Sequence, residues 1–169
     1  MNKKSPEAQR KYCAYYHSPI GTIEIIGLET GIASLTFARS KPAKPCPVHR
    51  CLKECLKQVD EYFNGKRKEF TVRLILQGTE FQKKVWRELL KIPYGETASY
   101  KDIAVAMGRE KAVRAVGNAN RLNKIAVIIP CHRVIGSNGK LVGYGGGLWR
   151  KKWLLEHEQE FSAAKKKRK

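Results

Sequence analysis

The sequence predicts an α/β N-terminal domain, a small antiparallel sheet with one helix, and a mainly α-helical C-terminal domain that contains a helix-turn-helix. Short segments rich in β-branched and aromatic residues open the chain, and turn residues separate them, which is typical of hairpin strands. From Thr79 onward, capping residues and glycine or proline stops enclose runs of helical periodicity. We therefore place the N-terminal domain, with its basic leader and Pro-rich loop, at 1–78, the second domain at 79–160 and a basic tail at 161–169.

The N-terminal domain is expected to hold three hairpin-connected strands, at 12–17, 22–27 and 32–37. The Pro-rich stretch 41–47 predicts a loop, and apolar residues at helical spacing predict a helix over 52–63 that covers the sheet. Apolar residues then alternate over 70–76, which predicts a further strand that ends at Gly78.

The second domain shows helical punctuation. A capping-box pattern beginning at Thr79 predicts a first helix that stops before Pro93. Two more helices are expected at 100–107 and 110–120, and Gly108 permits the left-handed turn between them. Any two adjacent helices give this helix-turn-helix pattern, so it is a weak signal by itself. Basic residues on the second of these helices strengthen it as a DNA-facing element, namely Lys111, Arg114 and Arg121.

Charge and hydropathy narrow the possible partners. Lysine and arginine outnumber aspartate and glutamate by 34 to 15, a formal net charge of +19 in 169 residues. Such an excess costs self-repulsion unless a polyanion relieves it, so nucleic acid is the expected partner. No apolar run approaches the roughly 18 to 20 residues that span a bilayer, and no signal-type apolar region follows the charged N-terminus. We expect no membrane partner and a reducing interior.

Five cysteines, an odd number without a secretory signal, argue against a disulfide framework. Four residues in the first domain raise the question of zinc, namely Cys46, His49, Cys51 and Cys55. They form no paired CxxC units, and their spacing suits a Pro-rich loop that enters a helix. We therefore predict no metal.

A cysteine follows the apolar run 125–129, which predicts a buried strand or extended segment that ends at Pro130. The sequence places Cys131 directly beside His132 and Arg133. A free thiol has a pKa of about 8.5, and a neighbouring histidine or arginine charge is expected to lower it and favour a nucleophilic thiolate. From these residues alone, a buried structural cysteine is an equally good interpretation.

The second domain as a whole resembles the DNA-binding and active-site domain of the O6-alkylguanine-DNA alkyltransferases, or methylated-DNA-protein-cysteine methyltransferases. The matching segments, in this order, are Gly95–Tyr100, Arg114–Gly117, Ile129–Val134, Gly143–Tyr144 and Leu154–Glu158. Their combination and spacing are highly specific, whereas the N-terminal half matches more loosely, chiefly through Ser18–Gly21.

The resemblance implies a DNA repair enzyme, a methylated-DNA-[protein]-cysteine S-methyltransferase that needs no cofactor. It implies that Cys131 accepts the alkyl group of O6-alkylguanine, and also of O4-methylthymine, as a thioether that ends turnover. His132 would deprotonate the thiol through a bridging water, and Glu158 would orient the imidazole. Asn123 matches the hinge asparagine between the DNA-binding helix and the active-site segment.

The resemblance also implies how damaged DNA is held. A base inside a duplex must be extruded before its O6 can react, at a cost of a few kcal/mol. Arg114 matches the arginine finger that fills the gap, and Tyr100 matches the residue that presses on the adjacent phosphate and contributes its hydroxyl to the base. Tyr144 would stack on the base, and the Gly145 amide would donate to O6. The carbonyls of Cys131 and Val134 would accept from the exocyclic amine.

We expect further contacts with double-stranded DNA from Lys111, Ala112, Arg121 and Ser137, and a monomer as the acting species. The chain departs from the usual pattern of the family at Lys124, Ala126 and Gly145, which leaves the pocket width open. Its basic end, Lys165–Lys169, adds nonspecific phosphate affinity or serves as a nuclear address. The expected location is the cytoplasm, with the nucleoid, in a prokaryote and the nucleus in a eukaryote.

Three other functions fit parts of the sequence. A noncatalytic protein that recognises alkyl lesions would share the scaffold but lack the acceptor Cys131. A helix-turn-helix regulator would need several Asn, Gln or Arg side chains that read base edges from the helix predicted at 110–120, which carries mostly Ala, Val and Gly. A cysteine hydrolase would use Cys131 and His132 with repeated turnover on acyl substrates.

Overall fold

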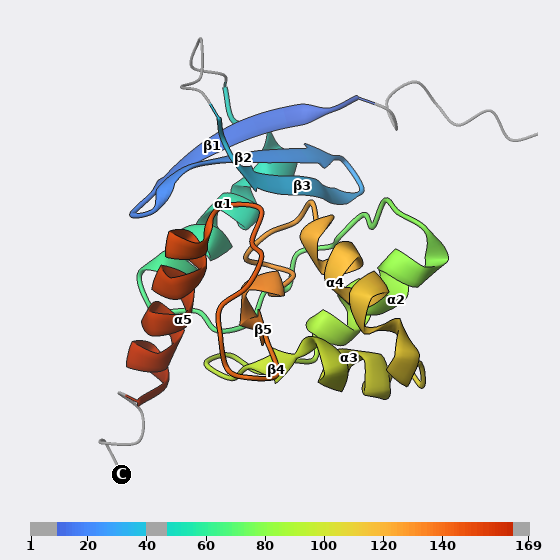
Figure 1. The fold of residues 1–169 in the computed structure, drawn as a ribbon. Coiled ribbons are helices and arrows are strands. Elements are labelled where there is room, and N and C mark those ends of the chain that lie inside the picture. The colour runs from blue at the N-terminus through green and yellow to red at the C-terminus, as the bar shows by residue number, and fades with distance from the viewer. Residues whose placement is uncertain (1–9, 40–46, 164–169) are drawn as a thin grey trace, which may run out of the picture. The chain divides into compact units, whose positions relative to one another are not determined.

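The computed structural model describes residues 10–39 and 47–163, which fall into two compact units, one ending at Leu76 and the other beginning at Gln77 (Figure 1). Nearly all of the basic leader, most of the Pro-rich loop with Cys46, and the run Lys165–Lys169 lie outside the described residues. None of the helices described is long and apolar enough to cross a membrane.

The first unit is an antiparallel three-stranded sheet with one helix, as predicted. The strands are β1 (Tyr12–Ser18), β2 (Gly21–Leu28) and β3 (Gly31–Phe37), paired in the order β1-β2-β3. The helix α1 (Arg50–Phe63) contacts all three strands and buries Leu52, Val59 and Tyr62 completely. Burial of this apolar face supplies the core of the unit.

The prediction of a strand over 70–76 is wrong. The segment makes a single parallel bridge, in which the Ile32 amide donates to the Arg73 carbonyl and the Ile75 amide donates to the Ile32 carbonyl, both at 2.8 Å. Two residues before Arg73, a side chain of α1 replaces a strand as the hydrogen-bond partner, because the Thr71 amide donates to Oε1 of Gln58 at 2.9 Å. With one of its backbone groups paired to a helix side chain, the segment does not continue the ladder.

The second unit is mainly helical. Its elements are α2 (Glu80–Leu89), β4 (Ala98–Ser99), α3 (Tyr100–Ala106), η2 (Glu110–Ala112), α4 (Val113–Arg121), η3 (Cys131–Arg133), β5 (Val134–Ile135) and α5 (Leu148–Ala163). The predicted capping box is present at α2, and Ser99 with Asp102 forms a second one at α3. Figure 1 shows β5 between α5 on one side and the group α2, α3 and α4 on the other.

The helix-turn-helix is confirmed, with one difference. Gly108 adopts a φ of 68° after α3, and the third predicted helix begins as the 3-10 turn η2 before α4 continues it. A tryptophan of α2 holds α4 in place, since Nε1 of Trp86 donates to the Ala119 carbonyl at 2.9 Å. The helix α4 is thus anchored to α2 through a buried hydrogen bond.

The prediction of a strand or extended segment over 125–129 is also wrong, because these residues form a buried turn. The Ile129 amide donates to the Ile125 carbonyl at 3.0 Å, and Val127 has a φ of 68°. The Asn123 side chain completes the turn, accepting from the Ile125 amide and donating to the Ile129 carbonyl, each at 2.9 Å. All five residues of 125–129 are buried, so their sequence carries no periodicity that distinguishes a turn from a strand.

Candidate active site

Cys131 begins η3 directly after this turn, and only 5% of its surface is exposed. Burial raises the pKa of its thiol; a hydrogen bond from Asn123, the charge of Lys151 and nearby backbone amides oppose that rise. The expectation that a histidine or arginine charge lowers this pKa is therefore wrong. Arg133 points to a carboxylate instead, and burial favours a neutral His132. The thiol stays protonated at neutral pH and needs a base.

The next residue, His132, carries a ring nitrogen that can accept a proton. Its imidazole is fully buried, and Nε2 donates to Oε1 of Glu158 at 2.8 Å. A carboxylate only accepts hydrogen bonds, so the proton belongs on Nε2 and Nδ1 keeps its lone pair. Nδ1 has no hydrogen-bond partner among residues 10–39 and 47–163. Burial lowers the pKa of His132 although Glu158 opposes it, which favours the neutral imidazole that can take up a proton.

Glu158 lies on α5, is fully buried, and accepts four hydrogen bonds. Besides His132, Arg133 donates from Nε at 2.8 Å and from Nη2 at 2.9 Å, and the Gly95 amide donates at 3.0 Å. Burial alone would raise the pKa of Glu158, but His132 and Arg133 together hold it well below its usual range. The carboxylate is ionised and its acceptor sites are filled, so the imidazole is held in one orientation.

The geometry also explains a glycine of the motif Gly95–Tyr100. Gly95 has a φ of 80°, and a Cβ added there would collide with Oγ of Ser162 in α5. Both the left-handed backbone and the close approach to Ser162 require glycine at this position. The resulting conformation brings the Gly95 amide to the Glu158 carboxylate.

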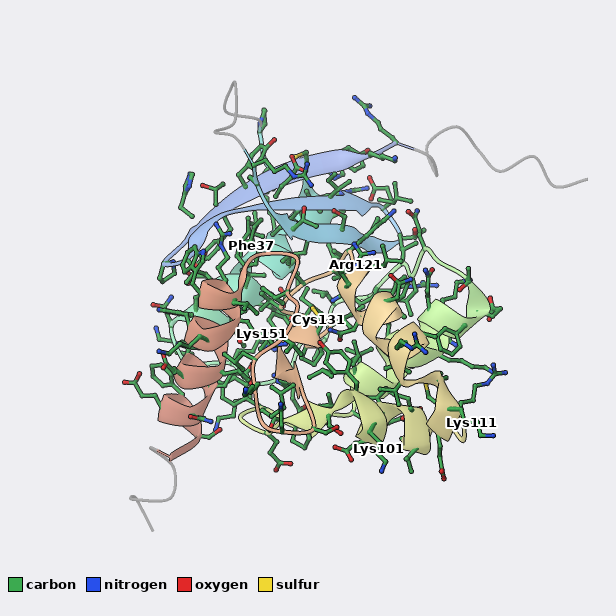
Figure 2. The ribbon with its side chains drawn as sticks, viewed as in Figure 1. Phe37, Lys101, Lys111, Arg121, Cys131 and Lys151 are labelled. Atoms are coloured by element: carbon green, nitrogen blue, oxygen red, sulfur yellow. The ribbon has the colours of Figure 1, made fainter. Side chains whose placement is uncertain are left out.

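Lys151 is a functional candidate that sequence reasoning missed. It is fully buried on α5, and Nζ donates to the Val142 carbonyl at 2.7 Å and to the Gly143 carbonyl at 3.4 Å. Burial lowers its pKa to about 8, and the proximity of Cys131 opposes that shift. Figure 2 shows Lys151 and Cys131 next to each other inside the unit. Its position two helical turns before Glu158, on the same face of α5, is the signal that would have found it.

Replacing Lys151 with Met is expected to slow the reaction of Cys131 with iodoacetamide at pH 7 about tenfold, because the positive charge that opposes the rise in the pKa of this thiol is lost. The rate would be measured by counting modified Cys131 in digested protein. Lys152→Met is the matched control, since Lys152 is exposed and pairs with the exposed Glu156 at 3.8 Å. Equal rates for the two variants would contradict a role of Lys151 in thiolate stabilisation.

The residues expected to hold the base come together around Cys131. Val134 follows η3, and its pairing with Ala98 in the parallel sheet of β4 and β5 brings the start of α3 alongside. Tyr100 begins α3, is half-buried, and donates its hydroxyl to the Val142 carbonyl at 3.2 Å. Burial and the nearby Cys131 raise the pKa of Tyr144 well above its usual value.

The loop 142–147 leaves space where a base was expected to approach. Gly145 is exposed, and a Cβ added there would meet no atom within 4 Å. Gly147, by contrast, has a φ of 93° and lies against the Trp149 ring. Gly145 is therefore not required for the fold of the loop.

The residues expected to contact DNA lie at the helix-turn-helix and after β5. Arg114 is exposed in the first turn of α4 and makes no hydrogen bond or ion pair with the rest of the described chain. Lys111 is exposed on η2, and Ala112 directly precedes α4. Ser137 is exposed in the turn after β5.

Arg121 and Lys111 differ in position. Figure 2 shows Lys111, with Lys101 of α3, at one end of the helix-turn-helix and Arg121 at the other end of α4. Nη2 of Arg121 donates to Oδ1 of Asn118 at 3.0 Å, so this arginine is already engaged. Lys101 is an exposed cation that sequence reasoning did not select.

The described part of the chain holds no group of three His, Cys, Asp or Glu side chains that could bind a metal ion. His49 lies 3.1 Å from Sγ of Cys51 through Nδ1, and 3.5 Å from Glu29 through Nε2. Because the two contacts use opposite ring nitrogens, they cannot serve one metal ion together.

Fold and site together define a helix-turn-helix protein that carries a buried cysteine next to a histidine bonded to a glutamate. The sequence matches two family models, the DNA-binding domain of 6-O-methylguanine DNA methyltransferase over residues 80–160 and its ribonuclease-like domain over 11–76. The chain belongs to the 6-O-methylguanine DNA methyltransferase family.

Relatives are similar over nearly their whole length. The methylated-DNA–protein-cysteine methyltransferase of Methanosarcina barkeri is 48% identical over 153 residues, covering 88% of this chain and 97% of the relative. The protein of that name from Mycobacterium leprae is 47% identical over 152 residues, covering 88% and 92%.

Solved structures agree in fold. The O6-methylguanine methyltransferase of Mycobacterium tuberculosis superimposes with a TM-score of 0.81 at 43% identity, covering 89% of this chain and 94% of that one. Mycobacterium tuberculosis OGT in complex with DNA gives a TM-score of 0.80 at 45% identity, with coverage of 87% and 92%.

Proposed function

We propose that this protein repairs DNA by transferring the alkyl group of O6-alkylguanine to Cys131, once per molecule. Its family membership and its similarity to methylated-DNA–protein-cysteine methyltransferases support the reaction. The observation that carries the residue assignment is the hydrogen bond between Glu158 and Nε2 of His132. It leaves Nδ1 of His132, the residue next to Cys131 in the chain, without a partner in the described part of the structure.

In the proposed reaction, Nδ1 of His132 accepts the thiol proton of Cys131 through a bridging water. The sulfur then attacks the alkyl carbon, and the bond from that carbon to O6 breaks with its electron pair moving to the guanine. Glu158 stabilises the imidazolium that forms, as the orienting acid of a catalytic triad does. A thioether is not hydrolysed, so the protein is spent.

Recognition of the base is assigned to five residues. The Gly145 amide is proposed to donate to O6, where charge develops as guanine leaves. Tyr144 stacks on the base, and Tyr100 contributes its hydroxyl, which must leave the Val142 carbonyl to do so. The Val134 carbonyl, with that of Cys131, accepts from the exocyclic amine.

The partner is double-stranded DNA, consistent with the net charge of +19 and with the DNA complex of a similar protein. Every residue proposed to act on the base belongs to the second unit of a single chain, which supports a monomer as the acting species. The proposed location follows the DNA, in the cytoplasm of a prokaryote or the nucleus of a eukaryote.

The other functions receive no such support. Cys131 is present, whereas a noncatalytic lesion-binding protein needs no acceptor. The exposed Asn118 and Arg121 of α4 bond to each other, which leaves few side chains to read base edges.

Duplex carrying a radiolabelled methyl group on O6 of guanine tests this function. The label should move to the protein and saturate near one equivalent. Continued turnover beyond one equivalent would contradict a suicide reaction.

Arg114→Ala is expected to slow repair of duplex at least tenfold while hardly changing attack on a free O6-alkylguanine base, because only the duplex requires the base to be extruded and the gap filled. Single-turnover rates on the two substrates would measure this. Lys101→Ala is the control, since it removes one exposed cation from the neighbouring helix. Equal losses on both substrates would rule out the finger role of Arg114.

A further inference from the structure

Asn120, the residue before the last of α4, has no role in the function proposed above. Its side chain is buried, with 3% of its surface exposed, although asparagine in a helix usually faces solvent. Nδ2 donates a long hydrogen bond to the Cys131 carbonyl at 3.4 Å. The Asn120 side chain also donates a hydrogen bond to Tyr100. This bond opposes the rise that burial causes in the pKa of Tyr100.

The other half of this amide is unsatisfied. Oδ1 of Asn120 is buried and has no hydrogen-bond partner within the described ranges 10–39 and 47–163. Buried acceptors are nearly always paired, and leaving one unpaired costs folding free energy. An acceptor kept unpaired between Tyr100 and Cys131 is explained if a ligand supplies the donor.

We propose that Asn120 recognises the 2-amino group of the extruded guanine, with Oδ1 accepting from that group while Nδ2 aligns the Cys131 carbonyl beside it. The inference rests on the proposed function and deepens it, because it assigns a further residue that selects the base. The 2-amino group has two N–H donors and no charge; in this arrangement the Cys131 and Val134 carbonyls share one N–H, and the other points to Oδ1 of Asn120. An amide offers an acceptor without burying a charge next to the reacting thiol.

The proposal makes Asn120 specific for guanine. A purine that lacks the 2-amino group leaves Oδ1 unpaired in the bound state, so binding it recovers none of the cost. A site of this kind discriminates against the analogue that lacks the donor.

The test compares single-turnover transfer from O6-methylguanine and from O6-methylhypoxanthine, which differ only in the 2-amino group, in otherwise identical duplexes. Asn120→Leu should slow transfer from O6-methylguanine about three- to tenfold, the effect of one neutral hydrogen bond, and hardly change transfer from O6-methylhypoxanthine. Asn120→Ser, a smaller change, should show the same difference if the leucine variant does not fold. Asn118→Leu is the matched control, because Asn118 is exposed on the same helix.

The outcomes separate the two claims. Equal slowing of both substrates by the Asn120 variants, or no slowing, would overturn the recognition of the 2-amino group and leave the alkyl transfer intact. If the unaltered protein moves no methyl group from either duplex to Cys131, the proposed function fails, and this inference fails with it.

Discussion

Cys131→Ser is expected to abolish alkyl transfer from O6-methylguanine in duplex DNA. The neutral imidazole of His132 can activate a thiol, but a serine hydroxyl is far less acidic and a poorer nucleophile for a saturated carbon. Binding to duplex should persist, because Cys131 is buried and the proposed DNA contacts lie on the helix-turn-helix and after β5.

Label transfer and an electrophoretic binding assay on the same preparation would measure both properties. A variant that binds duplex like the unaltered protein but transfers no label confirms the role of the sulfur. Residual transfer by the serine variant would assign the acceptor to another residue.

Glu158→Gln is expected to slow alkyl transfer a hundredfold or more and to lower the free energy of unfolding by about 3–5 kcal/mol. The rate falls because the amide no longer fixes and stabilises the His132 imidazole. The stability falls because Arg133, which makes two hydrogen bonds to this carboxylate, is left buried without a counter-charge. Urea unfolding and single-turnover kinetics measure the two effects.

Glu156→Gln is the matched control on the same helix, since Glu156 is exposed and only 3.8 Å from Lys152 in a surface pair worth at most about 1 kcal/mol. If Glu158→Gln retained the full rate, the orienting role would be wrong.

The pH dependence of stability gives a second check. Because the pKa of Glu158 is held below its usual value, its contribution is present above about pH 4.5 and is lost as pH falls toward its folded-state pKa. The stability difference between Glu158→Gln and the unaltered protein should therefore shrink in acid.

The sequence predicted the elements whose signals are local. The capping box at Thr79, the left-handed Gly108 and the three hairpin strands all depend on residues within a few positions of one another. The two segments predicted wrongly, 70–76 and 125–129, are shaped by side chains elsewhere in the chain or by complete burial, which periodicity does not register.

The same division holds for the site. Cys131 and His132 are adjacent in the chain and were selected from it, and Glu158 followed from the resemblance. Lys151 and Asn120 reach the site only through the packing of α5 and α4. Asn120 gives no sequence signal, because asparagine usually lies on the surface. Lys151 gives only its spacing of two helical turns from Glu158 on the same face of α5.

The most direct measurement is peptide mass spectrometry of the protein after exposure to duplex that contains O6-methylguanine. The structure describes four of the cysteines, Cys13, Cys51, Cys55 and Cys131, all as free thiols. We predict one methyl group per repaired base, located on Cys131 alone. A methyl group on any other residue, or repaired DNA with no methyl group on the protein, would contradict direct transfer to this sulfur.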